Sequence, residues 1–102
     1  MPKKLKPVHP GEILREEFMV PLGLSMNRMA MDLRAPVTRI ADIVNRRRGI
    51  TADTALRFAR YFRNSAAFWM NLQTRYDLEM AEEEIAAIVD RDVRPLELEA
   101  GR

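Results

Sequence analysis

The chain has 102 residues, 47% of them hydrophobic, and a formal net charge of +2, which indicates one domain with a single modest core. Cysteine is absent and histidine occurs once, so we expect neither disulfides nor a zinc centre, and the cytoplasm is the expected compartment. No uncharged apolar run approaches the roughly 20 residues that span a bilayer, and the basic N-terminus lacks the hydrophobic core of a signal peptide.

All elements expected along the chain are helices, because apolar and polar residues nowhere alternate for long enough to predict a strand. Residues 1–8 hold two prolines and three lysines and are expected to form a mobile basic arm. A first helix is predicted to begin at His9 and Pro10, since proline suits the first helical position, and to end at residues 21–23.

Two short helices joined by a tight turn are predicted over residues 25–45. Ser25 is a suitable N-cap, and apolar residues follow it at helical spacing up to Leu33. Pro36 is expected to begin the second helix. The predicted buried face of that helix comprises Val37, Ile40, Ile43 and Val44. This arrangement is typical of helix-turn-helix proteins that read DNA.

The outward-facing side chains of the second helix suit the edges of base pairs. Arg39 can donate two hydrogen bonds to one guanine, Thr38 can offer its hydroxyl or methyl group, and Asp42 can accept from a cytosine amine. Val37 could touch a thymine methyl group or stay in the core, and the core is the preferred place for it. The predicted base-reading residues are Val37, Thr38, Arg39 and Asp42.

Polar and cationic residues at the ends of these helices are expected to hold the phosphate backbone, which positions a protein on DNA without reading its sequence. Three consecutive arginines follow the second helix directly. The set predicted to bind phosphates is Ser25, Asn27, Arg28, Asn45, Arg46, Arg47 and Arg48.

A helix pair with a purely structural role is the alternative, because such pairs also occur in proteins that bind no DNA. The distribution of charge favours DNA. Residues 1–75 hold 14 Lys and Arg against 6 Asp and Glu, whereas residues 76–102 hold 3 against 9. The basic part suits a polyanion, since a merely solvated surface would mix both signs along the chain.

Two more helices are predicted after the arginines. Thr51 is the expected cap of the first of them, and an apolar line runs along it to Phe62. The second begins near residue 66 and carries the largest apolar cluster of the chain, around Phe68 and Trp69.

Catalytic function is not expected. Adjacent carboxylates such as Glu16 and Glu17 point about 100° apart on a helix and do not form a paired acid and base. His9 has no nucleophile or acid at a defined position beside it, and the four glycines are scattered rather than gathered into a phosphate-binding loop. We therefore predict no catalytic residue, no metal and no cofactor.

Three sequence segments occur in this order around the helix-turn-helix: HPGEILREEF, NRRRGITADTALRFARYF and FWMNLQTRYDLE. Together they resemble the HigA family of antitoxins within the Xre-like regulators, over residues 8 to about 80. The resemblance implies an all-α fold, with a compact five-helix domain of the Xre and lambda-repressor type over residues 9–80. A C-terminal helical extension, acidic in this chain, would cover residues 81–102.

The resemblance also implies activity and partners. HigA-like proteins are cytoplasmic antitoxins of type II toxin-antitoxin modules that neutralise a RelE-like, mRNA-cleaving toxin. As homodimers they also repress their own operon on palindromic operators in double-stranded DNA. An Xre-type transcriptional regulator with no cognate toxin is the alternative.

Family members dimerise largely through elements after the DNA-binding core. The residues expected at a dimer interface are Phe68, Trp69, Tyr76, Ile85 and Ile88. The core is the alternative place for these aromatic side chains; it is preferred for most of Trp69, and both places stay open for Tyr76.

Arg34 departs from the family, which usually has glycine in the turn between the two helices. This residue must adopt a left-handed conformation or require a different kind of turn. The angle between the two helices depends on which of these occurs.

The acidic tail has two roles that the sequence leaves open. Residues 82–99 could mask the basic surface of a toxin that cleaves RNA. Alternatively, Ile85, Ile88 and Val89 could mark the seam of a dimer, with Pro95 closing the helix.

Overall fold

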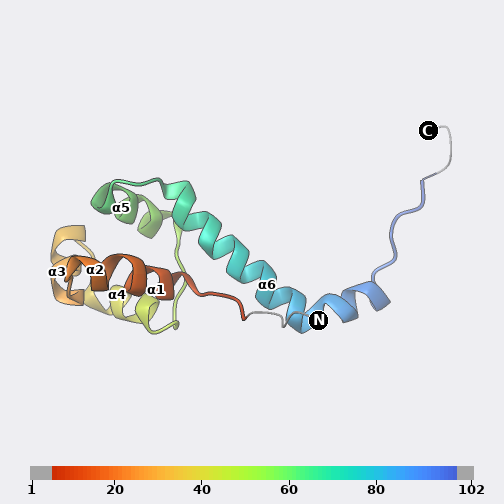
Figure 1. The fold of residues 1–102 in the computed structure, drawn as a ribbon. Coiled ribbons are helices and arrows are strands. Elements are labelled where there is room, and N and C mark those ends of the chain that lie inside the picture. Colours follow the sequence, from red (N-terminus) through yellow and green to blue (C-terminus); the bar gives the residue numbers. More distant parts are fainter. Residues whose placement is uncertain (1–5, 99–102) are drawn as a thin grey trace.

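The computed structural model describes residues 6–98, so most of the expected basic arm and residues 99–102 lie outside the described part of the chain. The described residues form helices and connecting segments but no strand (Figure 1). The elements in chain order are α1 (Pro10–Ile13), the π-helix η1 (Leu14–Met19), α2 (Val20–Leu22), α3 (Met26–Leu33), α4 (Val37–Val44), α5 (Ala52–Phe62) and α6 (Ala66–Asp92). Since α1, η1 and α2 run on without a gap, the described chain has five helical stretches, which confirms the predicted fold class.

Hydroxyl side chains cap the N-termini of three helices, α3, α5 and α6. Ser25, Thr51 and Ser65 each accept a hydrogen bond from the backbone N–H three residues further on, at 3.0, 3.4 and 3.0 Å. These bonds satisfy N–H groups that a helix leaves free at its start, and they confirm the caps predicted at Ser25 and Thr51. α4 differs from the prediction, because Pro36 precedes its first turn in extended backbone and supplies no side-chain cap.

The first helical stretch widens in its middle. The backbone N–H of Val20 donates to the carbonyl of Arg15, five residues back, as in a π-turn. Pro21 provides a physical cause, because proline has no N–H to donate and its ring crowds the carbonyl four residues earlier. Gly23 then ends the stretch in the left-handed conformation, at a φ of 63°, where the sequence predicted the stop.

The core lies where η1, α3, α4, α5 and the start of α6 meet, and each of these elements contributes a fully buried side chain. The largest members of this set are Leu14, Met29, Ile40, Ile43, Phe58 and Trp69. Trp69 is the largest, and its ring centroid lies 5.0 to 5.9 Å from those of Phe18, Phe58, Phe62 and Phe68. The indole N–H of Trp69 donates to the side-chain oxygen of Asn64 at 2.9 Å, so this buried donor is satisfied.

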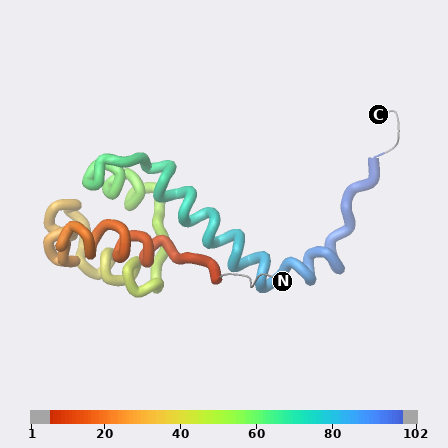
Figure 2. Tube along the Cα trace, viewed as in Figure 1, coloured from red at the N-terminus to blue at the C-terminus, as the bar shows by residue number. Residues whose placement is uncertain are grey.

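α6 runs out beyond the other helices (Figures 1 and 2). Trp69 is the one buried residue on this helix, and all residues from 81 to 98 are exposed. The described part of the molecule is consequently elongated, with extents of 59, 36 and 23 Å. α6 crosses residue 80 without a break, so the expected boundary between domain and extension falls inside one helix. Within residues 6–98, no helix is both long enough and apolar enough to cross a membrane.

Candidate nucleic-acid interface

α4 has one side in the core and one side open to solvent. Ile40 and Ile43 are fully buried, whereas Thr38 and Asn45 are exposed. Val37 is 40% exposed, which corrects the preference for the core, because the buried side of α4 begins one turn later, at Ile40. The open side therefore carries an apolar side chain, a hydroxyl with its methyl group, and an amide, all groups that can contact base edges or phosphates.

Arg39 and Asp42, the two charged residues predicted to read bases, are held by ion pairs within the chain. Arg39 donates to the carboxylate of Asp53 at 2.9 Å, and Asp42 accepts from Arg47 at 3.0 and 3.1 Å. The side chains of Arg39 and Asp42 are only 26% and 31% exposed. Contact with a base would require each of them to exchange a bond that it already makes.

The three arginines after α4 differ in their surroundings, although all are exposed. Arg46 adopts the left-handed conformation and pairs with Glu12 at 2.8 Å, and Arg47 pairs with Asp42. No side-chain hydrogen bond or ion pair of Arg48 is found among the described residues. The charge of Arg48 is thus available to a phosphate without the loss of an existing bond.

The residues predicted to bind phosphate at the start of α3 are also accessible. Ser25, Asn27 and Arg28 are exposed, but the Ser25 hydroxyl is engaged as the helix cap and Arg28 pairs with Asp32 at 3.1 Å. Asp32 also accepts a hydrogen bond from the hydroxyl of Tyr61 at 2.7 Å, which is the main cause that lowers the pKa of this carboxyl. Arg28 is therefore tied to a carboxylate that stays ionised.

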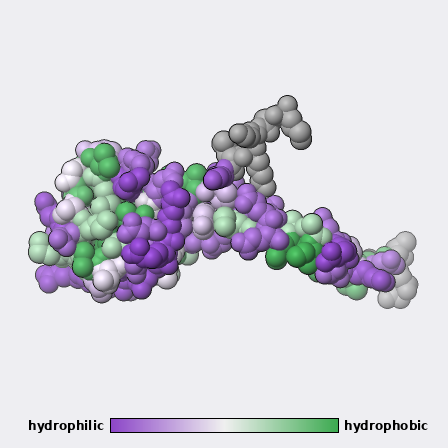
Figure 3. Space-filling view, turned by 90° about the horizontal axis from the view of Figure 1, so that it is seen from below, coloured by the Kyte–Doolittle hydropathy of each residue, from purple (hydrophilic) through white to green (hydrophobic). Residues whose placement is uncertain are grey.

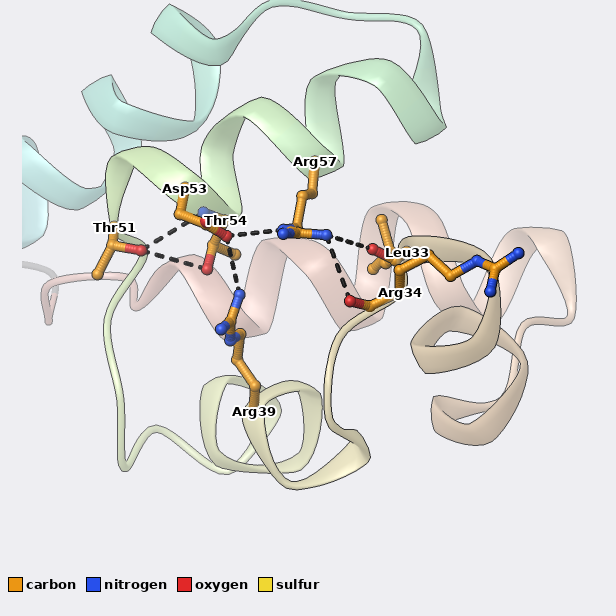
Figure 4. A network of polar contacts seen from close by, with 7 residues as sticks. All are labelled: Leu33, Arg34, Arg39, Thr51, Asp53, Thr54 and Arg57. Carbon is orange, nitrogen blue, oxygen red and sulfur yellow. Dashed lines mark hydrogen bonds and ion pairs between the residues drawn. The ribbon is translucent and has the colours of Figure 1, made fainter.

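A chain of hydrogen bonds joins the turn of the helix-turn-helix to α5 and α4 (Figure 4). Nη1 of Arg57 donates to the backbone carbonyls of Leu33 and Arg34, at 2.8 and 3.3 Å, where α3 ends. Nε of Arg57 donates to Oδ1 of Asp53 at 2.7 Å, and the same oxygen accepts from Arg39 at 2.9 Å. Arg57 thus satisfies carbonyls that a helix leaves free at its end and ties the turn to α4.

Arg34 takes the left-handed conformation, with φ of 57° and ψ of 44°, so the turn keeps the geometry that glycine would adopt. A residue with a Cβ atom loses about 1 to 2 kcal/mol in this conformation, and the two bonds from Arg57 offset part of that cost. Sequence reasoning missed Arg57 and Asp53, although their spacing of four residues on one helix is a usable signal for an ion pair.

Asp53 is held in its ionised form. The hydrogen bond from Arg57 is the largest influence and lowers the pKa of the carboxyl, desolvation opposes it, and Arg39 lowers the pKa further. Asp53 therefore keeps its negative charge beside the two arginines throughout the neutral pH range.

Gln73 of α6 holds the arginine loop, residues 46–50, in place. The side-chain oxygen of Gln73 accepts from the backbone N–H of Ile50 at 2.6 Å, and its amide nitrogen donates to Asp77 at 2.9 Å. A Cβ atom on Gly49 would lie 2.8 Å from the Gln73 amide group, so the loop approaches α6 as closely as glycine allows. The position of the arginines is thereby linked to α6.

His9 lies buried at the start of α1. Its Nδ1 accepts a hydrogen bond from the backbone N–H of Gly11 at 2.9 Å, which caps the first turn and supports a structural role for this residue. The ring meets that of Tyr76 edge-on, with centroids 4.8 Å apart. Burial is the main cause that lowers the pKa of His9, with Arg46 acting in the same direction.

The residues expected at a dimer interface lie in different surroundings. Trp69 lies in the core, which confirms the preference stated for it and removes it from the expected interface, because its side chain has no exposed surface to offer a second chain. Tyr76 is half-buried, and Phe68 is 37% exposed. Ile85 and Ile88 are each 46% exposed on the outer part of α6.

A shallow, mainly apolar groove of about 260 Å³ runs along the outer part of α6. Figure 3 shows this apolar surface between hydrophilic stretches of the same helix. The groove is lined by Leu78, Ala81, Glu82, Ile85, Ala86, Val89 and Asp90. Apolar surface of this kind on an extended helix is a feature of protein–protein contacts.

Comparison with known proteins gives three informative similarities, although no family model matches the chain. The chain is 50% identical over 96 residues to Virulence-associated protein I of Dichelobacter nodosus, which covers 89% of each chain. It is 32% identical over 76 residues to Antitoxin HigA-1 of Vibrio cholerae, which covers 74% of this chain and 70% of that protein. The solved structure of the Pseudomonas aeruginosa antitoxin HigA with the higBA promoter is 42% identical, with a TM-score of 0.87, and the match covers 90% of this chain and 100% of that one.

Proposed function

Because the chain belongs to the HigA family of antitoxins within the Xre-like regulators, we propose that it represses its own operon on operator DNA and neutralises a RelE-like, mRNA-cleaving toxin. The observation that carries the DNA-binding part is the open side of α4, which presents Val37, Thr38 and Asn45 beside the arginine loop. A recognition helix enters the major groove with base-reading residues near its start, while neighbouring cations hold phosphates. The Pseudomonas aeruginosa antitoxin was solved with the higBA promoter, which supports DNA binding by this chain.

Arg39→Ala should lower operator affinity by about 1 to 3 kcal/mol and relax the preference at one base position, because two hydrogen bonds to a guanine would be lost. Arg48→Ala should weaken operator and unrelated DNA alike and flatten the slope of log affinity against log salt by about one unit. Fluorescence anisotropy titrations at several salt concentrations measure both effects.

Arg75→Ala is the control for these titrations, because Arg75 is an arginine of α6 whose side chain is 79% exposed and which is not among the residues expected to contact DNA. It should leave the ratio of operator to unrelated affinity unchanged. Equal losses on both DNAs for Arg39→Ala would remove this residue from the base-reading set.

A homodimer is the second part of the proposal, because two copies of α4 in successive major grooves, roughly 34 Å apart, suit a palindromic operator. The apolar groove on α6 supports a seam along this helix. Ile85→Asp, which places a charge in that groove, should therefore give a monomer in sedimentation experiments and weaken operator binding. Leu96→Asp makes the same chemical change at an 86% exposed residue after the helix and should leave the dimer intact. A dimer of unchanged stability in Ile85→Asp would move the interface elsewhere.

The toxin part rests on family membership and is tested by co-expression with the neighbouring gene. Copurification of the two proteins and restored growth are the expected results, and failure of both would favour an Xre-type regulator with no cognate toxin.

Truncation after Met80 then distinguishes the two roles that are open for the acidic tail. Loss of toxin protection with operator binding intact favours masking by the tail, whereas loss of dimerisation favours the seam.

A further inference from the structure

Two different helices hold the two ends of the arginine loop. At its start, the backbone N–H groups of Arg47 and Arg48 donate to the carbonyl of Asp42 in α4, at 2.7 and 3.2 Å. At its end, the backbone N–H of Ile50 donates to Oε1 of Gln73 in α6 at 2.6 Å. Gln73 lies 23 positions further along the chain and outside the helix-turn-helix, so the shape of the loop depends on a helix that does not belong to that motif.

We propose that Gln73 is a positioning residue for DNA binding, which holds the peptide group between Gly49 and Ile50 so that Arg48 is ready to contact a phosphate. This inference rests on the proposed DNA-binding function. Gln73 itself contacts no phosphate in this proposal. It acts through the backbone that follows Arg48.

Arg48 depends on this backbone because its side chain has no other support. The other two arginines of the loop pair with carboxylates of the chain, at 2.8 and 3.0 Å, whereas among the described residues no side-chain hydrogen bond or ion pair of Arg48 is found. A cation on a fixed loop loses less conformational freedom when it meets a phosphate than a cation on a loose loop. The bond from Ile50 to Gln73 therefore lowers the entropic cost of the contact between Arg48 and DNA.

Gly49 belongs to the same arrangement. Its φ is not positive, so its backbone conformation does not require glycine. A Cβ atom at this position would instead lie 2.8 Å from both Oε1 and Nε2 of Gln73, which is too close for either group to stay in place. Glycine is thus needed at position 49 because the Gln73 amide lies against the loop.

Support of the fold alone explains the bond less well. The side chain of Ile50 is only 3% exposed and belongs to the core, so the end of the loop already has a fixed place without Gln73. The bond to Gln73 adds the orientation of the peptide group between Gly49 and Ile50. Nε2 of Gln73 donates to Oδ1 of Asp77 at 2.9 Å, and this second bond keeps the amide oxygen directed at the loop.

Gln73→Met tests the proposal, because methionine keeps the length of the side chain but lacks the amide oxygen. Affinity would be measured for the palindromic DNA upstream of the gene and for a scrambled duplex of equal length and composition. Both affinities should fall by about threefold to tenfold with little change in their ratio, because the loosened loop must be ordered on any DNA. Asn71→Met is the control: it removes an exposed amide about 200° around α6 from Gln73 and should leave both affinities unchanged.

An Arg48→Ala background identifies the route of the effect. Gln73→Met should cause no further loss of affinity there, because the arginine that it positions is absent. A loss of equal size in this background would overturn the proposal. A Gln73→Met protein that unfolds at a lower temperature but binds both duplexes as tightly as the unaltered protein would also overturn it, because the role of Gln73 would then be structural alone.

Either of these results would leave the proposed function in place, provided that the unaltered protein prefers the palindromic DNA. An unaltered protein without affinity for either duplex would instead contradict the proposed function and this inference together. Thermal unfolding followed by circular dichroism gives the temperature at which every variant is folded. Gln73→Ala replaces Gln73→Met if that variant unfolds, with the same expected losses.

Gly49→Ala gives a second, independent test. In the otherwise unaltered protein it should lower both affinities about as much as Gln73→Met, because the added methyl group displaces the Gln73 amide. In a Gln73→Ala background, which leaves room for that methyl group, Gly49→Ala should cause no further loss. An additional loss of the same size would show that the methyl group acts without Gln73 and would overturn the proposal.

Discussion

Replacing Trp69 with alanine should lower the free energy of unfolding by about 3 to 5 kcal/mol, the range typical of removing a fully buried aromatic side chain. Trp69 has no exposed surface, and aromatic rings from η1, α5 and α6 surround it. Alanine would leave a cavity between these rings and would deprive the Asn64 side chain of the N–H that it accepts at 2.9 Å. Chemical denaturation followed by far-UV circular dichroism measures the loss, because the variant has no other tryptophan to report by fluorescence.

Two further variants compare the contributions of the hydrogen bond and of ring burial to this loss of unfolding free energy. Trp69→Phe keeps an aromatic ring but loses the hydrogen bond to Asn64, so its cost should be smaller, about 1 to 2 kcal/mol. Phe68→Ala alters the neighbouring residue, which is 37% exposed, and should also cost less than Trp69→Ala. Equal losses for Phe68→Ala and Trp69→Ala would contradict the core assignment of the tryptophan.

Protein concentration distinguishes the core from the proposed dimer seam. Trp69 is buried within one chain, so the stability difference between Trp69→Ala and the unaltered protein should not vary with concentration. Ile85 is 46% exposed in one chain, and the effect of Ile85→Asp should vary with concentration because association stabilises the folded dimer.

The helices and their starts could be predicted from the sequence because the interactions that define them are local. Ser25 and Thr51 accept their capping bonds from N–H groups only three residues away. Their short polar side chains before an apolar stripe are sufficient signals. Val37 was placed wrongly for the same reason: helical spacing assigns it to the buried face, but the packed part of α4 begins at Ile40.

The side-chain arrangement around α4 could not be predicted, because it depends on partners distant in the sequence. Arg39 meets Asp53 across 14 positions, and Arg57 reaches the carbonyl of Leu33 across 24. The helical periodicity of the sequence correctly predicted that Arg39 faces away from the core. Periodicity contains no information, however, on which carboxylate Arg39 contacts. The left-handed turn at Arg34 is similar, because the residue that supports it lies on α5.

Gly11→Ala should cost about 3 kcal/mol of unfolding free energy although it adds only one methyl group. A Cβ atom at this position would lie 2.8 Å from the carbonyl carbon of Ile43 and nearer still to its oxygen. Both atoms belong to the backbone of α4, so no side-chain rotation relieves the contact and α1 must move away from α4. The added Cβ atom would also lie 3.1 Å from Nδ1 of His9.

Gly23→Ala is the matched control, because the same change occurs there without a close neighbour. Gly23 has a φ of +63° and nothing within 4 Å of an added Cβ atom, so its cost is limited to the backbone conformation, about 1 kcal/mol. At a temperature where both variants remain folded, operator affinity should fall in Gly11→Ala and persist in Gly23→Ala, because α1 packs directly against α4. Equal stability costs, or equal affinities, would mean that the close approach of α1 does not fix the position of α4.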